Sequence, residues 1–228
     1  MGKYKDFKTY IRKKIGLVGV AEFVNDSVEA NTQNTWNSLF SNPKFLKGYN
    51  TQGRISSLQE LIAFMDKHIN LSTTKSIVDV GCGTGLLLRE LNKSFPEIQL
   101  AGNDFSEESI ALCKQVLPTS DFYISDIYKK DASEKKYDVV MCSEVLEHLL
   151  YPDKALKNLF YLLKNVTPTH LVLAVPNGRL DTYGGHINFW SPESWNVFIN
   201  QNIDKERCSV ITDLFQNGRN IVSVINVK

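Results

Sequence analysis

The chain has 228 residues, of which 43% are hydrophobic and 22% are charged, and its formal net charge at pH 7 is +1. This length fits one domain with a sizeable core, and no apolar run approaches the roughly 20 residues that a membrane-spanning helix needs. The near-zero charge lacks the basic excess of proteins that follow phosphate backbones, so it argues against a nucleic-acid partner.

The N-terminal segment is rich in lysine but has neither the apolar stretch nor the cleavage site of a secretory signal, which predicts a cytoplasmic protein. Within it, apolar side chains recur at intervals of three and four residues: Tyr4, Phe7, Ile11, Ile15 and Val18. Such a stripe fits a solvated helix on the domain surface, which we favour, or peripheral contact with an anionic membrane.

Residues 31–70 have a helical pattern that combines aromatic side chains with a later apolar periodicity. The aromatic residues are Trp36, Phe40, Phe45 and Tyr49, and the periodic ones are Leu58, Leu61, Ile62 and Met65. We therefore predict a helical cap over residues 1–70, followed by one α/β unit over residues 71–228.

After residue 70, short apolar runs alternate with helical stretches, a pattern typical of a parallel sheet with crossover helices. Strands are expected at Ser76–Val80, Ile98–Asn103, Asp121–Ile124, Tyr137–Cys142 and His170–Val175, with helices starting near Thr84, Ser106, Pro152 and Ser191. Two further runs, Cys208–Leu214 and Asn220–Val227, flank Asn217-Gly218, a strong hairpin signal. The sequence thus predicts a doubly wound, mostly parallel α/β sheet that ends in an antiparallel hairpin.

The strongest local signal is the glycine-rich turn Gly81-Cys82-Gly83-Thr84-Gly85, which follows a buried strand containing Asp79. Glycines let a ligand approach the main-chain N–H groups at the start of a helix, because no Cβ stands in the way. A dinucleotide fingerprint would need its third glycine at Leu86, so the spacing argues against a nicotinamide-dependent dehydrogenase. The turn predicts a nucleotide-like ligand of another kind.

Acidic residues follow the next two strands. Asp104 stands at the carboxyl end of the second strand, where it can accept hydrogen bonds from both hydroxyls of a ribose. Its alternative role is to cap the next helix, for which Ser106 is the better residue. Asp126 follows the third strand and can accept a hydrogen bond from an adenine amino group, although loop aspartates also serve as turn residues.

The segment from Val78 to Gly85 resembles motif I of the class I S-adenosylmethionine-dependent methyltransferases, and the similarity extends over about residues 55–228. The resemblance implies the Rossmann-like, seven-stranded sheet of that family. It also implies an S-adenosylmethionine site formed by Asp79, Gly81, Cys82, Gly83, Gly85, Asp104, Phe105, Asp126, Ile127 and Ser143. Arg54 is a candidate partner for the cofactor carboxylate, with a surface ion pair as its alternative.

Glu144, Glu147 and His148 follow the fourth strand, at spacings that would put them on one face of a helical turn. The phrase Glu-Val-Leu-Glu-His resembles that of ubiquinone-biosynthesis O-methyltransferases and of sugar, lipid and natural-product methyltransferases. Here His148 is the candidate general base; alternatively, the cluster provides only hydrogen bonds, or it holds Mg²⁺ or Mn²⁺ together with His186. The phrase also resembles that of small-RNA 3′-end methyltransferases, in which two glutamates and two histidines bind a divalent cation.

The leading prediction is an S-adenosylmethionine-dependent O-methyltransferase that acts on a small molecule, a glycan precursor or a lipid-linked acceptor. One alternative is a metal-dependent RNA 3′-end 2′-O-methyltransferase, against which the net charge argues. The other is a non-catalytic S-adenosylmethionine-binding module, against which the cluster after the fourth strand argues. Aromatic candidates for the wall of the acceptor pocket are Trp36, Tyr49, Tyr183 and Trp190.

Overall fold

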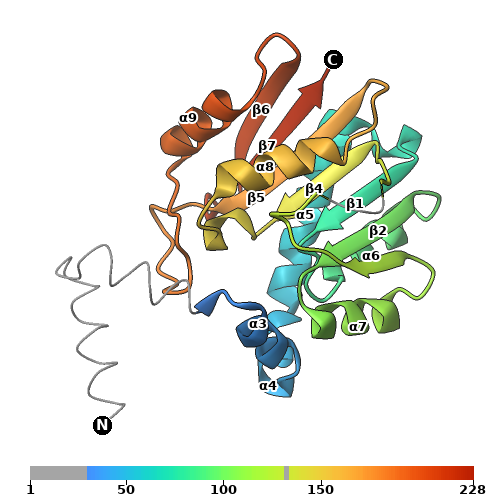
Figure 1. The fold of residues 1–228 in the computed structure, drawn as a ribbon, viewed down its shortest axis with the longest axis vertical. Coiled ribbons are helices and arrows are strands. Elements are labelled where there is room, and N and C mark those ends of the chain that lie inside the picture. The colour runs from blue at the N-terminus through green and yellow to red at the C-terminus, as the bar shows by residue number, and fades with distance from the viewer. Residues whose placement is uncertain (1–29, 131–133) are drawn as a thin grey trace, which may run out of the picture.

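The computed structural model describes residues 30–130 and 134–228, so the N-terminal apolar stripe and the first part of the expected cap lie outside the described residues. The chain forms a seven-stranded sheet with the strand order β3-β2-β1-β4-β5-β7-β6 (Figure 1). The strands are β1 (Ser76–Val80), β2 (Gln99–Asp104), β3 (Asp121–Ile124), β4 (Val139–Ser143), β5 (Thr169–Pro176), β6 (Cys208–Phe215) and β7 (Asn220–Val227). β7 pairs antiparallel with both β5 and β6, whereas the other pairs are parallel. The predicted fold class is confirmed.

Helices cover both faces of the sheet (Figure 1). They are α3 (Gln33–Phe40), α4 (Pro43–Tyr49), α5 (Gln52–Ile69), α6 (Leu86–Ser94), α7 (Glu107–Val116), α8 (Pro152–Tyr161) and α9 (Pro192–Asn202), with short 3₁₀ turns η1 (Leu71–Thr73) and η2 (Leu146–His148). Apolar residues of α5, α6 and α7 share one core with the sheet, and those of α8 and α9 share the other. The molecule is therefore a three-layer α/β/α structure.

The strand pattern explains these two cores, because successive side chains of a strand point to opposite faces. Every residue of β1 is buried, as expected of a parallel strand covered on both faces. Ile77 and Val139 enter the core beneath α5, while their neighbours Val78 and Val140 enter the core beneath α8. The continuous apolar runs seen in the sequence are thus a consequence of a sheet between two helical layers.

The carboxyl ends of the parallel strands meet at one edge of the sheet, and α3 and α4 lie beside this edge (Figure 1). Hydrogen bonds fix α3 there: Gln33 Nε2 donates to the Phe105 carbonyl over 2.6 Å, and Ser106 Oγ donates to Asn37 Oδ1, also over 2.6 Å. By contrast, α5 packs its buried face onto the sheet. Only α3 and α4 therefore stand outside the α/β/α layers among the described helices.

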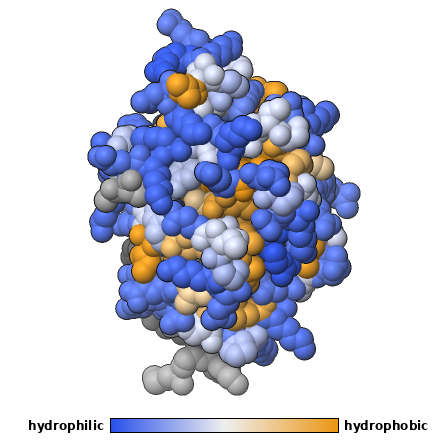
Figure 2. Space-filling view, turned by 90° about the vertical axis from the view of Figure 1, so that its right-hand side faces the viewer, coloured by the Kyte–Doolittle hydropathy of each residue, from blue (hydrophilic) through white to orange (hydrophobic). Residues whose placement is uncertain are grey.

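The outer surface is mixed. On the face shown in Figure 2, hydrophilic side chains predominate and surround the apolar ones that gather near its middle. Within residues 30–130 and 134–228, no helix has the length and apolar character needed to cross a membrane.

Candidate active site

A cavity of about 330 Å³ opens where β1, β2 and β4 end, beneath α3 and α4. It has an aromatic wall formed by Trp36, Phe40 and Tyr49. Six of the residues predicted to bind the cofactor line it: Gly81, Gly83, Asp104, Phe105, Asp126 and Ile127. The glycine turn and the two acidic strand ends therefore face one cavity, which is the arrangement that a nucleotide-like ligand requires.

The glycine turn is shaped by left-handed backbone conformations that favour glycine. Gly81 has a φ of +79° and Gly83 a φ of +53°. A Cβ on Gly83 would lie 3.1 Å from Tyr49 Oη, and one on Gly81 would lie only 2.4 Å from Val145 Cγ2. Side chains at these positions would close the cavity floor, so the glycines keep room for a ligand against the backbone.

Asp104 is 6% exposed and holds the turn in place. Its Oδ2 accepts a hydrogen bond from the Gly83 N–H over 3.0 Å, and its Oδ1 accepts one from the Ser106 N–H over 2.9 Å. Burial raises the pKa of Asp104, and these backbone donors oppose that rise. Ser106 itself caps α7 by accepting from Ser109 N–H, so Asp104 is not the cap of this helix, and it lines the cavity.

Asp126 is a turn residue that also lines the 330 Å³ cavity. Its Oδ1 accepts a hydrogen bond from the Tyr128 N–H over 2.9 Å, which is a turn interaction. Its Oδ2 lies 3.5 Å from Lys129 Nζ. The cavity wall on this side is completed by Ser125 and Tyr128.

Near the glycine turn lie the buried acid Asp79 and the half-buried cation Arg54. Arg54 Nη2 donates to Tyr49 Oη over 2.8 Å, and the guanidinium carbon lies 3.9 Å from the centre of the Tyr49 ring. Arg54 Nε is buried without a hydrogen-bond partner among the described residues. Burial and the charge of Asp104 raise the pKa of Asp79 from 3.8 to about 7, although Arg54 opposes this. A zwitterionic amino acid group fits beside these two residues, with its carboxylate at Arg54 and its ammonium group at Asp79.

The raised pKa of Asp79 predicts that the free energy of unfolding of the ligand-free protein depends on pH. Because folded Asp79 keeps a proton that the unfolded chain releases above pH 3.8, its contribution to stability is complete below that pH and lost as the pH rises through about 7. We expect the loss to reach up to about 4 kcal/mol, at roughly 1.36 kcal/mol per pKa unit. Urea unfolding at several pH values would measure it.

Asp79→Asn should remove this part of the pH dependence. The comparison is needed because Glu144 and Glu147, whose pKa values are also raised, act in the same direction as Asp79. His148, whose pKa is lowered, acts in the opposite direction between pH 6.5 and about 4. If the wild-type protein and Asp79→Asn have parallel stability curves from pH 4 to 8, the buried carboxylate is not protonated in the folded state.

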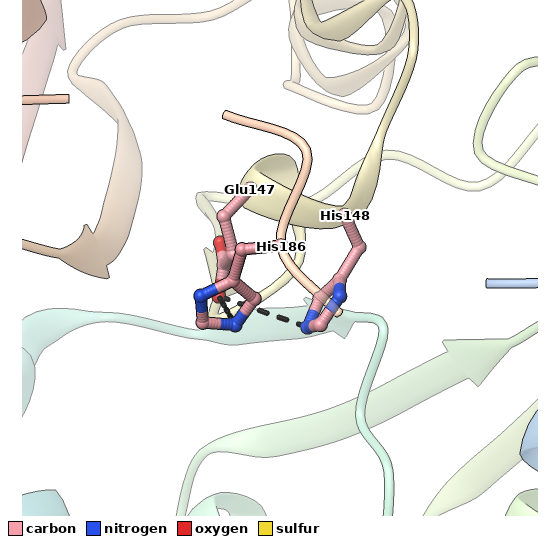
Figure 3. Close-up of side chains that lie close together, drawn as sticks. All are labelled: Glu147, His148 and His186. Carbon is pink, nitrogen blue, oxygen red and sulfur yellow. Dashed lines mark ion pairs between the residues drawn. The ribbon is translucent and has the colours of Figure 1, made fainter. Parts of the chain in front are cut away.

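Next to the 330 Å³ cavity, three side chains converge from two separate segments (Figure 3). Glu147 and His148 belong to η2, and His186 comes from the loop after β5. One ligand atom from each lies within 4.8 Å of the others. The Nε2 atoms of both histidines are 4.0 Å from Glu147 Oε1, so the two rings face the same carboxylate oxygen.

The partners of the other ring nitrogens indicate the tautomer of each histidine. His186 Nδ1 lies 2.5 Å from Asp181 Oδ2, and His148 Nδ1 lies 3.4 Å from the Gly185 carbonyl oxygen. Both partners only accept hydrogen bonds, so each Nδ1 carries the hydrogen and each Nε2 of a neutral ring presents a lone pair to Glu147. Burial and the neighbouring His186 lower the pKa of His148 to about 4, which keeps that ring neutral.

Glu147 completes a group of acceptors that lacks a donor. It is 1% exposed, and neither of its carboxylate oxygens has a hydrogen-bond partner in the part of the chain that is described. Burial raises the pKa of Glu147 well above its usual value, and the charge of Glu144 adds to the effect. Three hydrogen-bond acceptors that face one another need a proton or a cation between them.

Glu144 does not lie on a helical face with the other two. Its φ of +59° places it in the left-handed region before η2, and its N–H donates to the Ala174 carbonyl over 2.9 Å. It therefore stands apart from the three atoms that cluster most tightly. Burial raises the pKa of Glu144 to about 7, which Arg54 partly opposes, and its Oε1 is buried with no hydrogen-bond partner among the described atoms.

Glu144 also lines a second cavity, of about 570 Å³, on the side of α5 and the β6–β7 turn. Three more of the predicted site residues, Arg54, Ser143 and His186, line this second cavity rather than the first. Asp79, Cys82 and Gly85 line neither of these two: Gly85 is the N-cap of α6, and Cys82 Sγ lies 3.6 Å from Cys113 Sγ. Glu147 is buried and lines neither cavity.

Several site residues carry no recognisable sequence signal. Asp181, which orients His186, lies in a loop with no periodic pattern.

Of the predicted aromatic residues of the acceptor pocket, Trp36 and Tyr49 line the 330 Å³ cavity, and the Tyr183 ring lies 4.8 Å from the His186 ring. Trp190 instead packs against Trp195, with ring centroids 5.1 Å apart.

Comparison with known families matches residues 49–205 to a family model described as a methyltransferase domain. Among curated proteins, malonyl-[acyl-carrier protein] O-methyltransferase from Bacillus anthracis is 30% identical over 105 residues, which covers 45% of this chain and 39% of the relative. Ubiquinone biosynthesis O-methyltransferase from Coxiella burnetii (strain Dugway 5J108-111) is 31% identical over 125 residues, covering 51% and 52% respectively. The chain thus spans about half the length of these relatives, or less.

Solved structures share the fold. The plantazolicin methyltransferase BpumL, in complex with a pentazolic desmethylPZN analog and SAH, superposes with a TM-score of 0.64 at 16% identity, over 91% of this chain and 99% of that one. A small RNA methyltransferase gives a TM-score of 0.64 at 20% identity, over 75% of this chain and 25% of that one. At these identities the likeness concerns the fold alone.

Proposed function

This chain belongs to the methyltransferase-domain family, an S-adenosylmethionine-dependent group of enzymes with this Rossmann-like fold, and we propose that it methylates an oxygen atom of a small or carrier-linked acceptor. The observation that supports an oxygen acceptor best is the group formed by Glu147, His148 and His186 beside the cofactor cavity. Both curated relatives named above are O-methyltransferases.

In this proposal the methyl donor occupies the 330 Å³ cavity. Asp104 accepts the ribose hydroxyls, Asp126 accepts the adenine amino group, and the aromatic wall encloses the ligand on the side of the glycine turn. Arg54 lines the neighbouring cavity and donates to Tyr49, which lines the cofactor cavity, so its guanidinium is the candidate partner for the cofactor carboxylate. Asp79, whose pKa the charge of Arg54 lowers, is the candidate partner for the ammonium group. The helical cap formed by α3 and α4 keeps water from the site.

The donor set fits a divalent cation. Two Nε2 lone pairs and a buried carboxylate without a donor converge on one point, and their Nδ1 hydrogens are already engaged. Imidazole nitrogens suit Mn²⁺ better than Mg²⁺, which prefers oxygen ligands, so we favour Mn²⁺. When bound, such a cation lowers the pKa of an acceptor hydroxyl and holds its oxygen. Glu147, His148 and His186 would hold it.

Proton transfer is then assigned to Glu144 rather than to His148. A pKa of about 7 poises Glu144 to accept a proton near neutral pH, whereas a pKa of about 4 makes His148 a weak base. Glu144 also lines both cavities, so an acceptor oxygen that faces the methyl group lies within its reach. Alignment and deprotonation are what methyl transfer asks of the protein, since the sulfonium is already activated.

A second candidate is methylation of an RNA 3′ end. The convergence of Glu147, His148 and His186 favours it, because this is the ligand type that the resemblance to small-RNA methyltransferases implies. The net charge of +1 argues against it, since RNA binding relies on a basic surface.

A methyl-transfer assay tests the proposal. The protein would be incubated with radiolabelled S-adenosylmethionine and a panel of hydroxyl, carboxyl, amine and 3′-end RNA acceptors, with EDTA or with Mn²⁺. We expect transfer to an oxygen acceptor that is not RNA, increased by Mn²⁺. Transfer only to amines, or no dependence on Mn²⁺, would contradict the proposed chemistry.

Asp181 provides a sharper test of the cation site. Its carboxylate orients His186 through Nδ1, so Asp181→Asn should weaken Mn²⁺ binding by about 10- to 100-fold, as is usual for such supporting residues. Electron paramagnetic resonance of free Mn²⁺ would measure the affinity, and ¹⁵N NMR would show the His186 ring losing its single tautomer.

Asp213→Asn is the matched control, because Asp213 is an exposed residue of β6. It should leave both readouts unchanged. Should Asp181→Asn bind Mn²⁺ as tightly as the wild-type protein, with the His186 tautomer intact, Asp181 does not support the site.

A further inference from the structure

The 570 Å³ second cavity has the position expected for the methyl acceptor, and its chemistry indicates what kind of molecule it takes. Its walls come from α5, from the loop after β5 and from the turn between β6 and β7, and they include Arg54, Ser57, Asp181, Gln216, Arg219 and Asn220. Glu144 and His186 lie at the same cavity, so a molecule held there meets both while the cofactor occupies the neighbouring cavity.

The β6–β7 turn is held rigidly at this cavity. Gln216 and Asn217 both have a φ of +54°, a left-handed conformation that is unusual for residues other than glycine, and above all for Gln216. Such conformations persist where surrounding contacts fix them, and they gather at ligand sites. The buried Asn177 supplies these contacts: its N–H donates to the Arg219 carbonyl over 2.7 Å, and its Nδ2 donates to the Gly218 carbonyl over 2.9 Å.

A further bond ties the turn to α5, since the Gln216 N–H donates to Glu60 Oε1 over 3.0 Å. Asn220 Nδ2 donates to Gln216 Oε1 over 3.1 Å, which links two of the polar side chains that line the cavity. Arg219 therefore belongs to a turn that hydrogen bonds join to Asn177 on one side and to α5 on the other.

The charges of the cavity are incompletely paired. Its lining cations are Arg54 and Arg219, and neither forms an ion pair with a carboxylate in the described part of the chain. Asp181 is occupied by His186 and by the Tyr183 N–H. Once the cofactor carboxylate has taken Arg54, as proposed above, the Arg219 guanidinium remains. This group is always charged, and its planar fork matches a carboxylate or a phosphate.

We infer that the acceptor carries an anionic group, a carboxylate or a phosphate, which Arg219 binds in the second cavity while the oxygen to be methylated lies at Glu144 and His186. This inference rests on the proposed function, since it takes the second cavity as the acceptor site. It makes Arg219 a specificity-determining residue that acts on binding and not on the methyl-transfer step.

The test uses small probes and the S-adenosylhomocysteine-bound protein. Calorimetry or NMR would follow titration with malonate, with inorganic phosphate and with neutral malonamide. We expect at least one anion to bind and malonamide to bind at least tenfold more weakly; the stronger anion identifies the group. Arg219→Gln should weaken anion binding by about tenfold or more, and Arg219→Lys by less.

Arg179→Gln is the matched control, because Arg179 is also exposed but pairs with Glu193 and does not line the cavity. It should bind the anion like the wild-type protein, and with an anionic acceptor Arg219→Gln should raise KM while leaving kcat within about twofold. Equal binding of malonamide, unchanged binding by Arg219→Gln, or no anion binding would overturn the inference. Failure of S-adenosylhomocysteine to bind would instead refute the cofactor assignment, and titration of the ligand-free protein would still test Arg219.

Discussion

Asp104→Asn should lower the affinity for S-adenosylhomocysteine by about 100-fold or more. Two ribose hydroxyls that donate to a carboxylate contribute roughly 1.5–3 kcal/mol each, and the amide of Asn keeps only one acceptor oxygen. That oxygen is also needed by the Gly83 N–H, which Asp104 Oδ2 binds over 3.0 Å. The glycine turn would therefore lose its anchor together with the ligand contact. Calorimetric titration measures the affinity.

Asp126→Asn is the graded control for this experiment. Its single proposed contact is with the adenine amino group, and an amide oxygen can still accept that hydrogen bond, so we expect a loss of less than about tenfold. Thermal unfolding must show that both variants are folded, because Asp104 is buried. An unchanged affinity in folded Asp104→Asn would mean that the ribose does not bind at this strand end.

Glu147→Gln should have opposite effects on metal binding and on metal-free stability. It removes the charged oxygen that both His148 and His186 face at 4.0 Å, so Mn²⁺ affinity should fall by at least about 100-fold and turnover by about 1,000-fold. In metal-free protein the new amide can donate to the histidine lone pairs, which relieves a buried carboxylate that has no donor among the described residues. The free energy of unfolding should therefore rise, by about 1–3 kcal/mol.

Urea unfolding with EDTA and paramagnetic titration of Mn²⁺ give the two readouts. Glu193→Gln is the control, since Glu193 is an exposed glutamate paired with Arg179 and lies away from the cluster. If Glu147→Gln keeps the wild-type affinity for Mn²⁺, the three side chains are not a cation site, and a proton on Glu147 is what holds them together.

Most of the fold could be predicted from the sequence, because periodicity and turn chemistry are local. The strands Ser76–Val80, Asp121–Ile124 and Asn220–Val227 have the predicted bounds, and the hairpin signal Asn217-Gly218 lies between β6 and β7 as expected. The helix expected near Thr84 begins at Leu86, since Gly85 takes a left-handed φ of +70° at its N-cap. The differences elsewhere are of one or two residues at strand ends, where pairing with neighbours decides the boundary.

The gathering of strand-end residues at one cavity was also predictable, since strand ends of a parallel sheet meet at one edge. Gly83, Asp104 and Asp126 come from three different strand ends and line one cavity. Helical spacing misled at Glu144, where a positive φ breaks the expected turn. Asp181 and Arg219 act through loops whose approach to the site depends on tertiary contacts, such as those of Asn177, and no local pattern encodes these.

The measurement that tests the central claim most directly is isothermal titration of the purified protein with S-adenosylhomocysteine, first with EDTA and then with Mn²⁺. We expect one molecule to bind per chain in EDTA, because the residues that line the cofactor cavity need no cation, and a separate Mn²⁺-binding heat. The absence of binding under both conditions, with no rise in the unfolding temperature, would contradict the assignment of the glycine-turn cavity as an S-adenosylmethionine site.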